Sequence, residues 1–237
     1  MLFFSVGVQA DVSEKRIEWY LTPTYDGSRP RGAVSEDYLA ENGAFYLGPD
    51  EKVVYLTFDL GYENENVGRI LDTLKKEKVP ATFFLLRHTV QNGKYLGEIA
   101  ASHLAANHTL YHKDMTKIGN INDFRAELDG LSDLYREKTG KEMAKIYRPP
   151  CGAFSEQNLA FAKELGYKTA FWSLAYADWD ERAQPDPAAA LQKVLSRIHN
   201  GAVILLHPTS SANAKILPSL IARLKKEGYR FETLDKI

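Results

Sequence analysis

The chain has 237 residues, and its 30 Lys and Arg against 31 Asp and Glu give a formal net charge of −1. This balance excludes a protein that binds nucleic acid through a strongly basic surface, and no apolar run approaches the roughly 20 residues that a membrane-spanning helix needs. A composition with 44% apolar residues excludes a disordered chain, and a single cysteine excludes an internal disulfide and a cysteine-based zinc finger.

The first 52 residues do not show the pattern of a domain. Residues 1–10 (MLFFSVGVQA) are apolar and end on a small residue, so they are interpreted either as the remnant of a signal peptide without its positive n-region or as an ordinary tail. The stretch 27–49 is rich in Gly, Pro and Ser and has no clear period. We therefore expect residues 11–52 to form an arm that wraps a main domain spanning residues 53–237.

From residue 53 onward, short runs of β-branched, aromatic and aliphatic residues recur about every 30 residues, which is the length of a βα unit. Seven such runs predict strands, at residues 53–59, 81–86, 103–107, 146–150, 167–174, 202–208 and 229–235. Several of them are apolar almost throughout, as expected for parallel strands that are covered on both faces.

Helical patterns lie between these runs. Val67, Ile70, Leu71 and Leu74 recur at helical spacing and predict a helix over residues 67–78. Similar patterns cover residues 122–138, 188–199 and 212–227, the last ending in two lysines before Gly228. Alternating strands and helices predict an α/β fold with a parallel sheet, either open or closed into a barrel.

Polar residues follow the ends of five predicted strands. All carboxyl ends of a parallel sheet lie at one rim, so we expect these side chains to converge there. They are Asp59 at the end of the first strand, His108 and His112 after the third, Arg148 near the end of the fourth, Asp178 after the fifth and His207 near the end of the sixth. Such a convergence indicates an enzyme.

Each of these residues also has a simpler interpretation. His108 and His112 are four positions apart, a spacing that also occurs by chance. In a helix their rings would share one face and supply two of the three protein ligands that a catalytic zinc usually has. Asp59 is either a turn or helix-capping residue or a general base for a metal-bound water. Arg148 is either a surface arginine before a turn or a bidentate clamp on a carboxylate such as Asp59.

The other two residues leave the same choice open. His207 follows an apolar run and is either a buried core histidine or a general acid facing the rim. Asp178 either begins a helix, orients His207 or pairs with Arg148, and the sequence does not decide among these three.

Five short strings stand in an order that resembles the polysaccharide deacetylase family, also called the NodB-homology or carbohydrate esterase 4 family. They are Thr57-Phe58-Asp59-Leu60-Gly61, His108-Thr109-Leu110-Tyr111-His112, Arg148-Pro149-Pro150-Cys151-Gly152, Asp178-Trp179 and Leu205-Leu206-His207. The resemblance covers residues 53–237. Further strings, Phe45-Tyr46-Leu47-Gly48 and Phe171-Trp172-Ser173-Leu174-Ala175, look most like the PdaA-like subgroup, which acts on muramic acid in peptidoglycan and leads to the muramic δ-lactam of the spore cortex.

The resemblance implies a distorted (β/α) barrel of about seven parallel strands with a groove for a peptidoglycan glycan strand, in a protein that works outside the cytoplasm. It also implies a divalent metal, most often zinc, that binds a water and the acetamide oxygen. The implied roles are as follows: His108 and His112 hold the metal, Asp59 takes the proton from water, Arg148 orients Asp59, His207 protonates the leaving amine, Asp178 tunes one of these partners, the backbone N–H of Cys151 stabilises the oxyanion, and Leu206 packs against the acetyl methyl group.

Aromatic residues near these strings, Trp179 and Tyr62 among them, either stack on sugar rings or belong to the core. The chain also departs from the family pattern. Leu60 stands where family members usually carry a second, metal-binding aspartate, and Ala175 replaces the first aspartate of the Asp-Trp motif. We therefore expect weak metal binding.

The departures keep two alternatives to a muramic acid deacetylase open. One is a catalytically impaired glycan-binding protein of the same fold, and the other is a deacetylase of another N-acetylated polysaccharide. Asp59, Arg148 and His207 favour the enzyme, because a pure binder has no evident use for a base, its clamp and an acid together.

Overall fold

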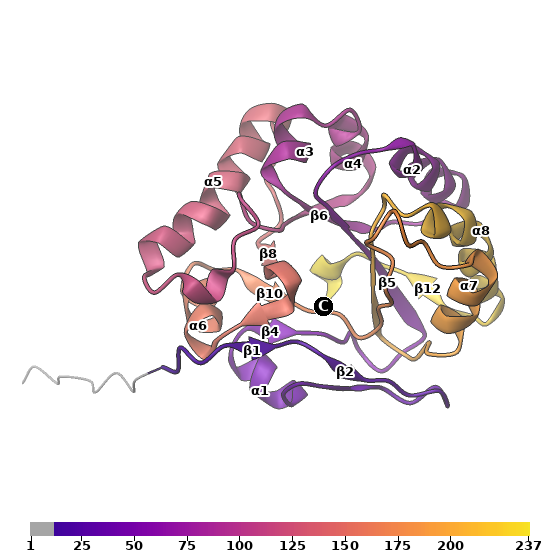
Figure 1. The fold of residues 1–237 in the computed structure, drawn as a ribbon, viewed down its shortest axis with the longest axis horizontal. Helices are drawn as coiled ribbons and strands as arrows, with labels where there is room; N and C mark the ends of the chain where they lie inside the picture. Colours follow the sequence, from indigo (N-terminus) through magenta and orange to yellow (C-terminus); the bar gives the residue numbers. More distant parts are fainter. Residues whose placement is uncertain (1–11) are drawn as a thin grey trace, which may run out of the picture.

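Eight parallel strands form the central sheet of the computed structural model, which describes residues 12–237 (Figure 1). Seven of them follow the order β11 (Ala202–Leu206), β5 (Val53–Leu60), β6 (Thr82–Leu85), β7 (Leu104–Asn107), β8 (Ile146–Tyr147), β10 (Lys168–Ala170) and β4 (Ala44–Phe45), and β12 (Arg230–Phe231) pairs with the start of β5. The predicted α/β class and the distorted (β/α) barrel are confirmed, and all seven predicted runs contain a strand. The first ten residues, interpreted as a signal remnant or tail, lie outside the described residues.

The sheet curls until its two edges meet. Leu47, two residues beyond β4, forms an isolated bridge with Ala202, the first residue of β11, and Leu174 forms a second bridge with Ile204. The amide of Gly48 also donates a hydrogen bond to the carbonyl of Gly201 at 2.9 Å. Strand β4 comes from the segment that the sequence assigns to the arm. A strand of two residues is too short to show a period, so the sequence pattern did not reveal it.

Helices surround the sheet (Figure 1). Four correspond to the predicted ones: α2 (Glu65–Glu77), α5 (Ile121–Thr139), α7 (Pro187–Leu195) and α8 (Ser211–Lys226). Each begins at a side-chain cap, from Asn64, Asn120, Asp186 and Ser210 respectively, that accepts a hydrogen bond from a free backbone amide of the first turn. Further helices are α1 (Glu36–Glu41), α3 (Arg87–Asn92), α4 (Leu96–Ser102) and α6 (Glu156–Glu164), with 3-10 turns η1 (Met115–Lys117), η2 (Pro150–Gly152) and η3 (Leu234–Lys236).

The alternation of side chains along β5 decides where the site lies. Val54, Leu56, Phe58 and Leu60 belong to the large apolar core that also includes buried residues of α2 and α8. Val53 and Tyr55 belong to a second cluster with residues of the neighbouring strands, which fills the barrel interior. Successive side chains of a strand point to opposite faces, so Asp59 is on the interior face at the carboxyl end of β5.

Residues 12–52 run along one side of the barrel (Figure 1). Strand β1 (Ile17–Glu18) pairs antiparallel with β9 (Ala153–Phe154), and β2 (Leu21–Thr22) pairs with β3 (Arg31–Gly32). Trp19 is buried, stacks on Phe171 with ring centroids 4.5 Å apart, and donates its indole N–H to the carbonyl of Trp172 at 3.0 Å. The arm therefore supports the loops that follow β8 and β10. None of the helices within residues 12–237 is both long and apolar enough to cross a membrane.

Candidate active site

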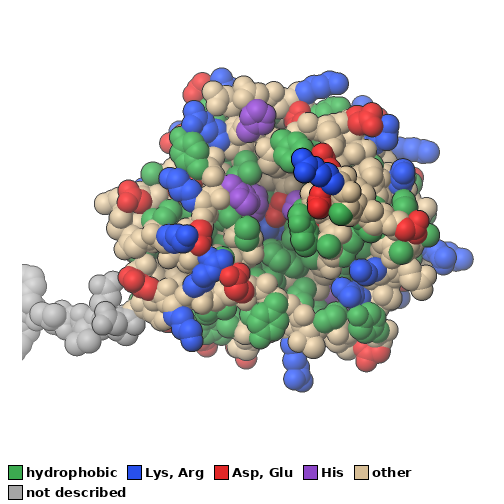
Figure 2. Space-filling model, viewed as in Figure 1, with side chains coloured by type: hydrophobic (Ala, Val, Ile, Leu, Met, Phe, Trp, Pro, Cys, Tyr) green, Lys and Arg blue, Asp and Glu red, His purple; other side chains and the backbone are tan. Residues whose placement is uncertain are grey.

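A cavity of about 680 Å³ opens at the carboxyl ends of the strands. Its polar wall contains Asp59, His108, His112 and His207, and its apolar wall includes Trp172, Tyr176, Trp179 and Leu205. Figure 2 shows a hollow on this face, with histidine and acidic side chains inside it. The structure therefore brings together the residues that the sequence places at the rim, while Arg148 and Asp178 lie just behind this wall and contact it through hydrogen bonds.

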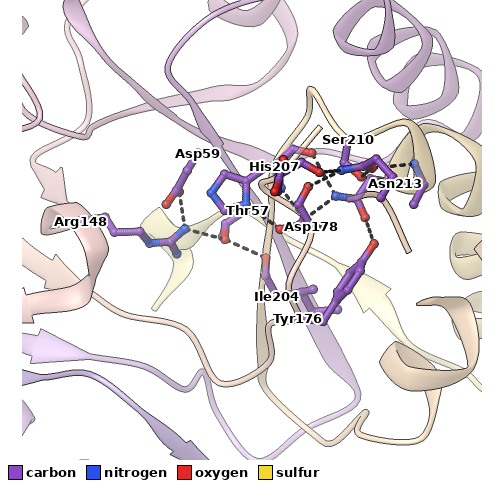
Figure 3. A network of polar contacts seen from close by, with 12 residues as sticks. Thr57, Asp59, Arg148, Tyr176, Asp178, Ile204, His207, Ser210 and Asn213 are labelled. Atoms are coloured by element: carbon purple, nitrogen blue, oxygen red, sulfur yellow. Dashed lines mark hydrogen bonds and ion pairs between the residues drawn. The ribbon is translucent and has the colours of Figure 1, made fainter. Parts of the chain in front are cut away.

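Arg148 and Asp59 form a buried ion pair (Figure 3). The Arg148 side chain is 0% exposed, and its Nη1 donates to Oδ1 of Asp59 at 2.7 Å and to Oγ1 of Thr57 at 3.0 Å. Its Nε and Nη2 donate to the carbonyls of Ala170 and Phe171, and the guanidinium lies 4.0 Å from the centre of the Phe84 ring. Arg148 contacts Asp59 through Nη1 alone, so the prediction of a bidentate contact is wrong, although the predicted pairing with Asp59 is present. Oδ2 of Asp59 is left to face the cavity.

The charges around Asp59 hold it ionised. Burial alone would raise the pKa of this carboxyl, but the opposing effects of Arg148, His108 and His207 outweigh burial and place the pKa below its ordinary value. The carboxylate is therefore available as a proton acceptor at neutral pH. Its Oδ2 lies 3.6 Å from Nε2 of His108, which leaves both groups beside the same part of the cavity.

His108 and His112 meet without a helix. Residues 108–112 form a loop after β7, and Thr109 and His112 have positive φ angles of 73° and 53°. The side chain of Asn107 accepts from the amide of Thr109, and Oγ1 of Thr109 accepts from the amide of His112, so side chains take the place of helical hydrogen bonds. The helix considered for residues 108–112 is therefore not formed. The two ring centroids are nevertheless only 4.9 Å apart.

Two imidazoles fit a metal centre in part. Nδ1 of His108 is 2.9 Å from the carbonyl oxygen of Arg148, which fixes the ring and leaves Nε2 toward the cavity, as in metal-binding histidines. Burial lowers the pKa of His108 to about 4 and also lowers that of His112, so both rings are neutral and able to bind a cation. No complete group of three His, Cys, Asp or Glu ligands is present within residues 12–237, and Leu60 is buried in the apolar core.

The second buried pair joins Asp178 to His207. Oδ1 of Asp178 is 2.7 Å from Nδ1 of His207, and its Oδ2 accepts from the backbone amide of His207 at 2.8 Å. Burial alone would lower the pKa of His207, but the hydrogen bond and charge of Asp178 raise it above its ordinary value. Of the three sequence alternatives for Asp178, the structure shows orientation of His207.

A network behind this pair has no clear signal in the sequence (Figure 3). Nδ2 of Asn213, in the first turn of α8, donates to Oδ2 of Asp178 at 2.6 Å and to the carbonyl of His207 at 3.0 Å. Tyr176, which also lines the cavity, donates its hydroxyl to Oδ1 of Asn213. Thr57 supports Arg148 in a similar way, by donating to the carbonyl of Ile204 at 2.7 Å. These supports depend on tertiary contacts that periodicity and spacing do not report.

The remaining predicted residues fall in different places. Cys151 is exposed and lines the cavity, and its φ of 56° shapes the turn after Arg148. Trp179 is 62% exposed at the cavity wall, edge-on to His207. Tyr62 is 46% exposed but is not among the cavity's lining residues. Leu206, which the resemblance places against the acetyl group, is buried in the core, whereas its neighbour Leu205 lines the cavity.

Comparison with known proteins gives matching results over most of the chain. The profile of the family described as polysaccharide deacetylase matches residues 47–170. The peptidoglycan-N-acetylmuramic acid deacetylase PdaA of Bacillus subtilis is 37% identical, over 95% of this chain and 87% of that protein. Its structure, that of a family 4 carbohydrate esterase, superposes with a TM-score of 0.89 and covers 95% of this chain and 97% of that one.

Two other relatives differ from PdaA in substrate or in activity. A peptidoglycan-N-acetylglucosamine deacetylase of Bacillus cereus is 34% identical, over 79% of this chain and 89% of that protein. The structure of BA3943, a CE4 family pseudoenzyme from Bacillus anthracis, has a TM-score of 0.74 and 30% identity, and covers 81% of this chain and 68% of that one. This fold is therefore found both in deacetylases and in a protein described as a pseudoenzyme.

Proposed function

Because the chain belongs to the polysaccharide deacetylase family, whose members are hydrolases acting on N-acetyl amides, we propose that it removes the acetyl group from muramic acid residues of peptidoglycan. One observation carries the catalytic part of this proposal. A carboxylate whose pKa is lowered beside Arg148 and an imidazole whose pKa is raised beside Asp178 line the same cavity. Two groups whose pKa values are shifted apart in this way suit an acid and a base acting on one substrate.

In the proposed reaction, Asp59 takes a proton from the attacking water, and Arg148 keeps its carboxylate in place through Oδ1. His207 then donates the proton from Nε2 to the amide nitrogen as the C–N bond breaks, since its Nδ1 is engaged with Asp178. The backbone N–H of Cys151 is proposed to stabilise the oxyanion. The products are acetate and a muramic acid with a free amine, and that amine is what closure onto the lactyl carboxyl needs in a muramic δ-lactam.

Deacetylases of this family are generally metal-dependent. We assign His108 and His112 to a divalent cation, with zinc as the first candidate because neutral imidazole suits it. When bound, the cation would polarise the acetamide carbonyl and acidify the water. With Leu60 in the core, the remaining coordination positions must be filled by water or substrate, so we expect the affinity for the metal to be low.

The cavity wall suits the rest of the substrate. Leu205, which replaces Leu206 in this role, is proposed to pack against the acetyl methyl group, and the exposed face of Trp179 offers a surface for a sugar ring. Tyr62 lies outside this wall, so a contact with it would require a substrate that extends beyond the cavity. The substrate lies outside the cytoplasm, where we propose that this protein also acts.

Acetate release from purified peptidoglycan tests the function. The wild type is compared with Asp59→Asn and with Asp72→Asn, an exposed carboxylate on α2 that serves as control. Digestion of the product and mass spectrometry of the fragments show which sugar has lost its acetyl group. We expect wild type and Asp72→Asn to produce deacetylated muramic acid and Asp59→Asn to lose nearly all of this activity.

Two results would favour the alternatives. Loss of acetyl groups from glucosamine units alone would identify a deacetylase of another N-acetylated sugar. No acetate from any of the three proteins, with zinc supplied, would identify a glycan-binding protein that has lost catalysis, as the incomplete ligand set and the pseudoenzyme of the same fold allow.

A further inference from the structure

Two smaller compartments adjoin the catalytic cavity. One, of about 340 Å³, shares His112 with the cavity and is also lined by Arg87 and Tyr111. The other, of about 220 Å³, shares Trp172 and Ala175 with it and is also lined by Arg197. The first is lined by residues of α3 and the second by Leu21 of β2. These two elements lie on different sides of the barrel (Figure 1).

Each compartment contains an arginine held by an exposed tyrosine. Nη1 of Arg87 donates to the hydroxyl of Tyr111 at 2.7 Å, and its guanidinium lies 5.3 Å from the centre of that ring. Nη2 of Arg197 donates to the hydroxyl of Tyr25 at 3.1 Å, with 5.4 Å between guanidinium and ring centre. Such contacts fix the orientation of a guanidinium without neutralising its charge.

Neither arginine has an acidic partner. Within residues 12–237, no carboxylate lies within 4.0 Å of either guanidinium, whereas Lys113, which also lies over the Tyr111 ring, is paired with Glu127 at 2.7 Å. Nε of Arg197 is buried and has no hydrogen-bond partner in this described part of the chain. The lining residues of all three compartments include a single carboxylate, Asp59, and it is already paired with Arg148.

The geometry points to a glycan-binding groove in which Arg87 and Arg197 bind carboxylates of the glycan on the two sides of the reacting sugar. This inference rests on the proposed function and adds to it the chemistry of the strand. An oriented guanidinium with free N–H groups matches a carboxylate, and two of them, separated by the catalytic cavity, match a polymer that carries carboxylates at intervals. The substrate is then a glycan with free lactyl carboxylates, bound in its interior and not at its end.

Binding measurements test this inference without requiring catalysis. Isothermal titration calorimetry compares the wild type with Arg87→Gln, Arg197→Gln and the double variant. The ligands are peptide-free peptidoglycan glycan strands, the same strands after reduction of their carboxyl groups, and a peptide-free disaccharide. Arg136→Gln is the control, because Arg136 is an exposed arginine in the last turn of α5 and lines none of the three compartments.

We expect each single variant to bind the carboxylate-bearing strand roughly three- to tenfold more weakly, and the double variant to show the product of both losses. The carboxyl-reduced strand should bind all variants alike. For the disaccharide, the double variant should lose no more binding affinity than the single variant that binds it more weakly, because so short a ligand reaches one arginine at most.

Equal affinity of the wild type for the native and reduced strands would overturn the inference, and so would an equal loss in Arg136→Gln. A double variant no weaker than the single ones on the long strand would limit binding to one side and overturn the two-sided groove. These outcomes are separate from the fate of the proposed function, since a protein that releases no acetate can still show or lack the carboxylate dependence.

Discussion

The carboxylate of Asp178 holds His207 at two points: Oδ1 lies 2.7 Å from Nδ1 of the ring, and Oδ2 accepts from the backbone amide at 2.8 Å. Asn213 donates to the same carboxylate at 2.6 Å. Ring and backbone are thereby fixed together, and the Nε2 atom of the ring is left for the cavity. This arrangement fixes the direction of the ring and raises the pKa of His207 above its ordinary value.

Replacing Asp178 by Asn should shift the pH dependence of acetate release. In the wild type, the hydrogen bond and charge of Asp178 outweigh burial and raise the pKa of His207, so the protonated acid persists to higher pH. Without the charge, the pKa of His207 falls and the proton is lost at lower pH. The alkaline limb of the kcat profile should therefore move to lower pH.

The control for this shift is Asp180→Asn, which removes a carboxylate from the same loop. In the described residues, the Asp180 carboxylate accepts one hydrogen bond, from the backbone amide of Arg182. Its profile should match that of the wild type. An unchanged alkaline limb in Asp178→Asn, with the variant folded, would contradict the role of His207 as the acid.

Replacing Arg148 by Met should destabilise the protein because it leaves Asp59 buried without its counter-ion. Loss of one partner from a buried pair costs about 3–5 kcal/mol, and urea unfolding monitored by circular dichroism measures it. In the Asp59→Asn/Arg148→Met double variant the orphaned charge is absent, so the loss should be smaller than the sum of the single losses. Arg136→Met, at an exposed site, should change the free energy of unfolding by at most about 0.5 kcal/mol. Strict additivity would contradict the pairing.

The sequence predicts the convergence of these residues for a simple reason: parallel strands end at one rim, so residues after the strands meet there. It does not predict which of them pair. Asp178 lies in the loop after β10, and only the path of that loop selects His207 over Arg148. The register of Leu205 and Leu206 is a similar case, because both are apolar and the alternation along a fully buried strand leaves no mark in the sequence.

The loop at residues 108–112 shows how local contacts override spacing. Histidines four apart suggest a helix, but Thr109, a β-branched residue, adopts a positive φ because Asn107 and its own hydroxyl cap the turn. The rings meet by this route instead. Position 60 was informative without a structure, since leucine cannot bind a metal whatever its surroundings.

Replacing Leu60 by Asp should increase the affinity for zinc about tenfold, because it restores a carboxylate at the position where members of this family usually carry a metal-binding aspartate. The same change should lower the stability of the zinc-free protein, since Leu60 is fully buried among apolar side chains. Calorimetric titration with zinc and urea unfolding with and without zinc measure both effects. Leu60→Asn, similar in shape but uncharged, is the control. Equal zinc affinity in wild type and Leu60→Asp would refute the expectation.

Replacing Gly152 by Ala should disturb the contact between the arm and the cavity wall. Gly152 has a φ of 70°, and a Cβ atom there would lie 2.7 Å from Cη2 of Trp172 and 2.9 Å from Cβ of Trp19. The variant therefore suffers both the strain of a left-handed residue and overpacking against two tryptophans, a combined loss of about 2–5 kcal/mol. Urea unfolding gives this loss, and tryptophan fluorescence of the folded protein reports the displaced rings.

Gly140→Ala separates the two contributions, because Gly140 has nearly the same φ, 67°, and a Cβ atom there would have no neighbour within 4 Å. It should lose only the conformational part, about 1–2 kcal/mol, with unchanged fluorescence. Acetate release should fall in Gly152→Ala and not in Gly140→Ala, since Trp172 lines the cavity and Gly152 follows Cys151, whose amide is assigned to the oxyanion. Equal losses of stability in the two variants would mean that Trp19 and Trp172 move aside without a loss of free energy of unfolding. The arm would then not fix this wall of the cavity.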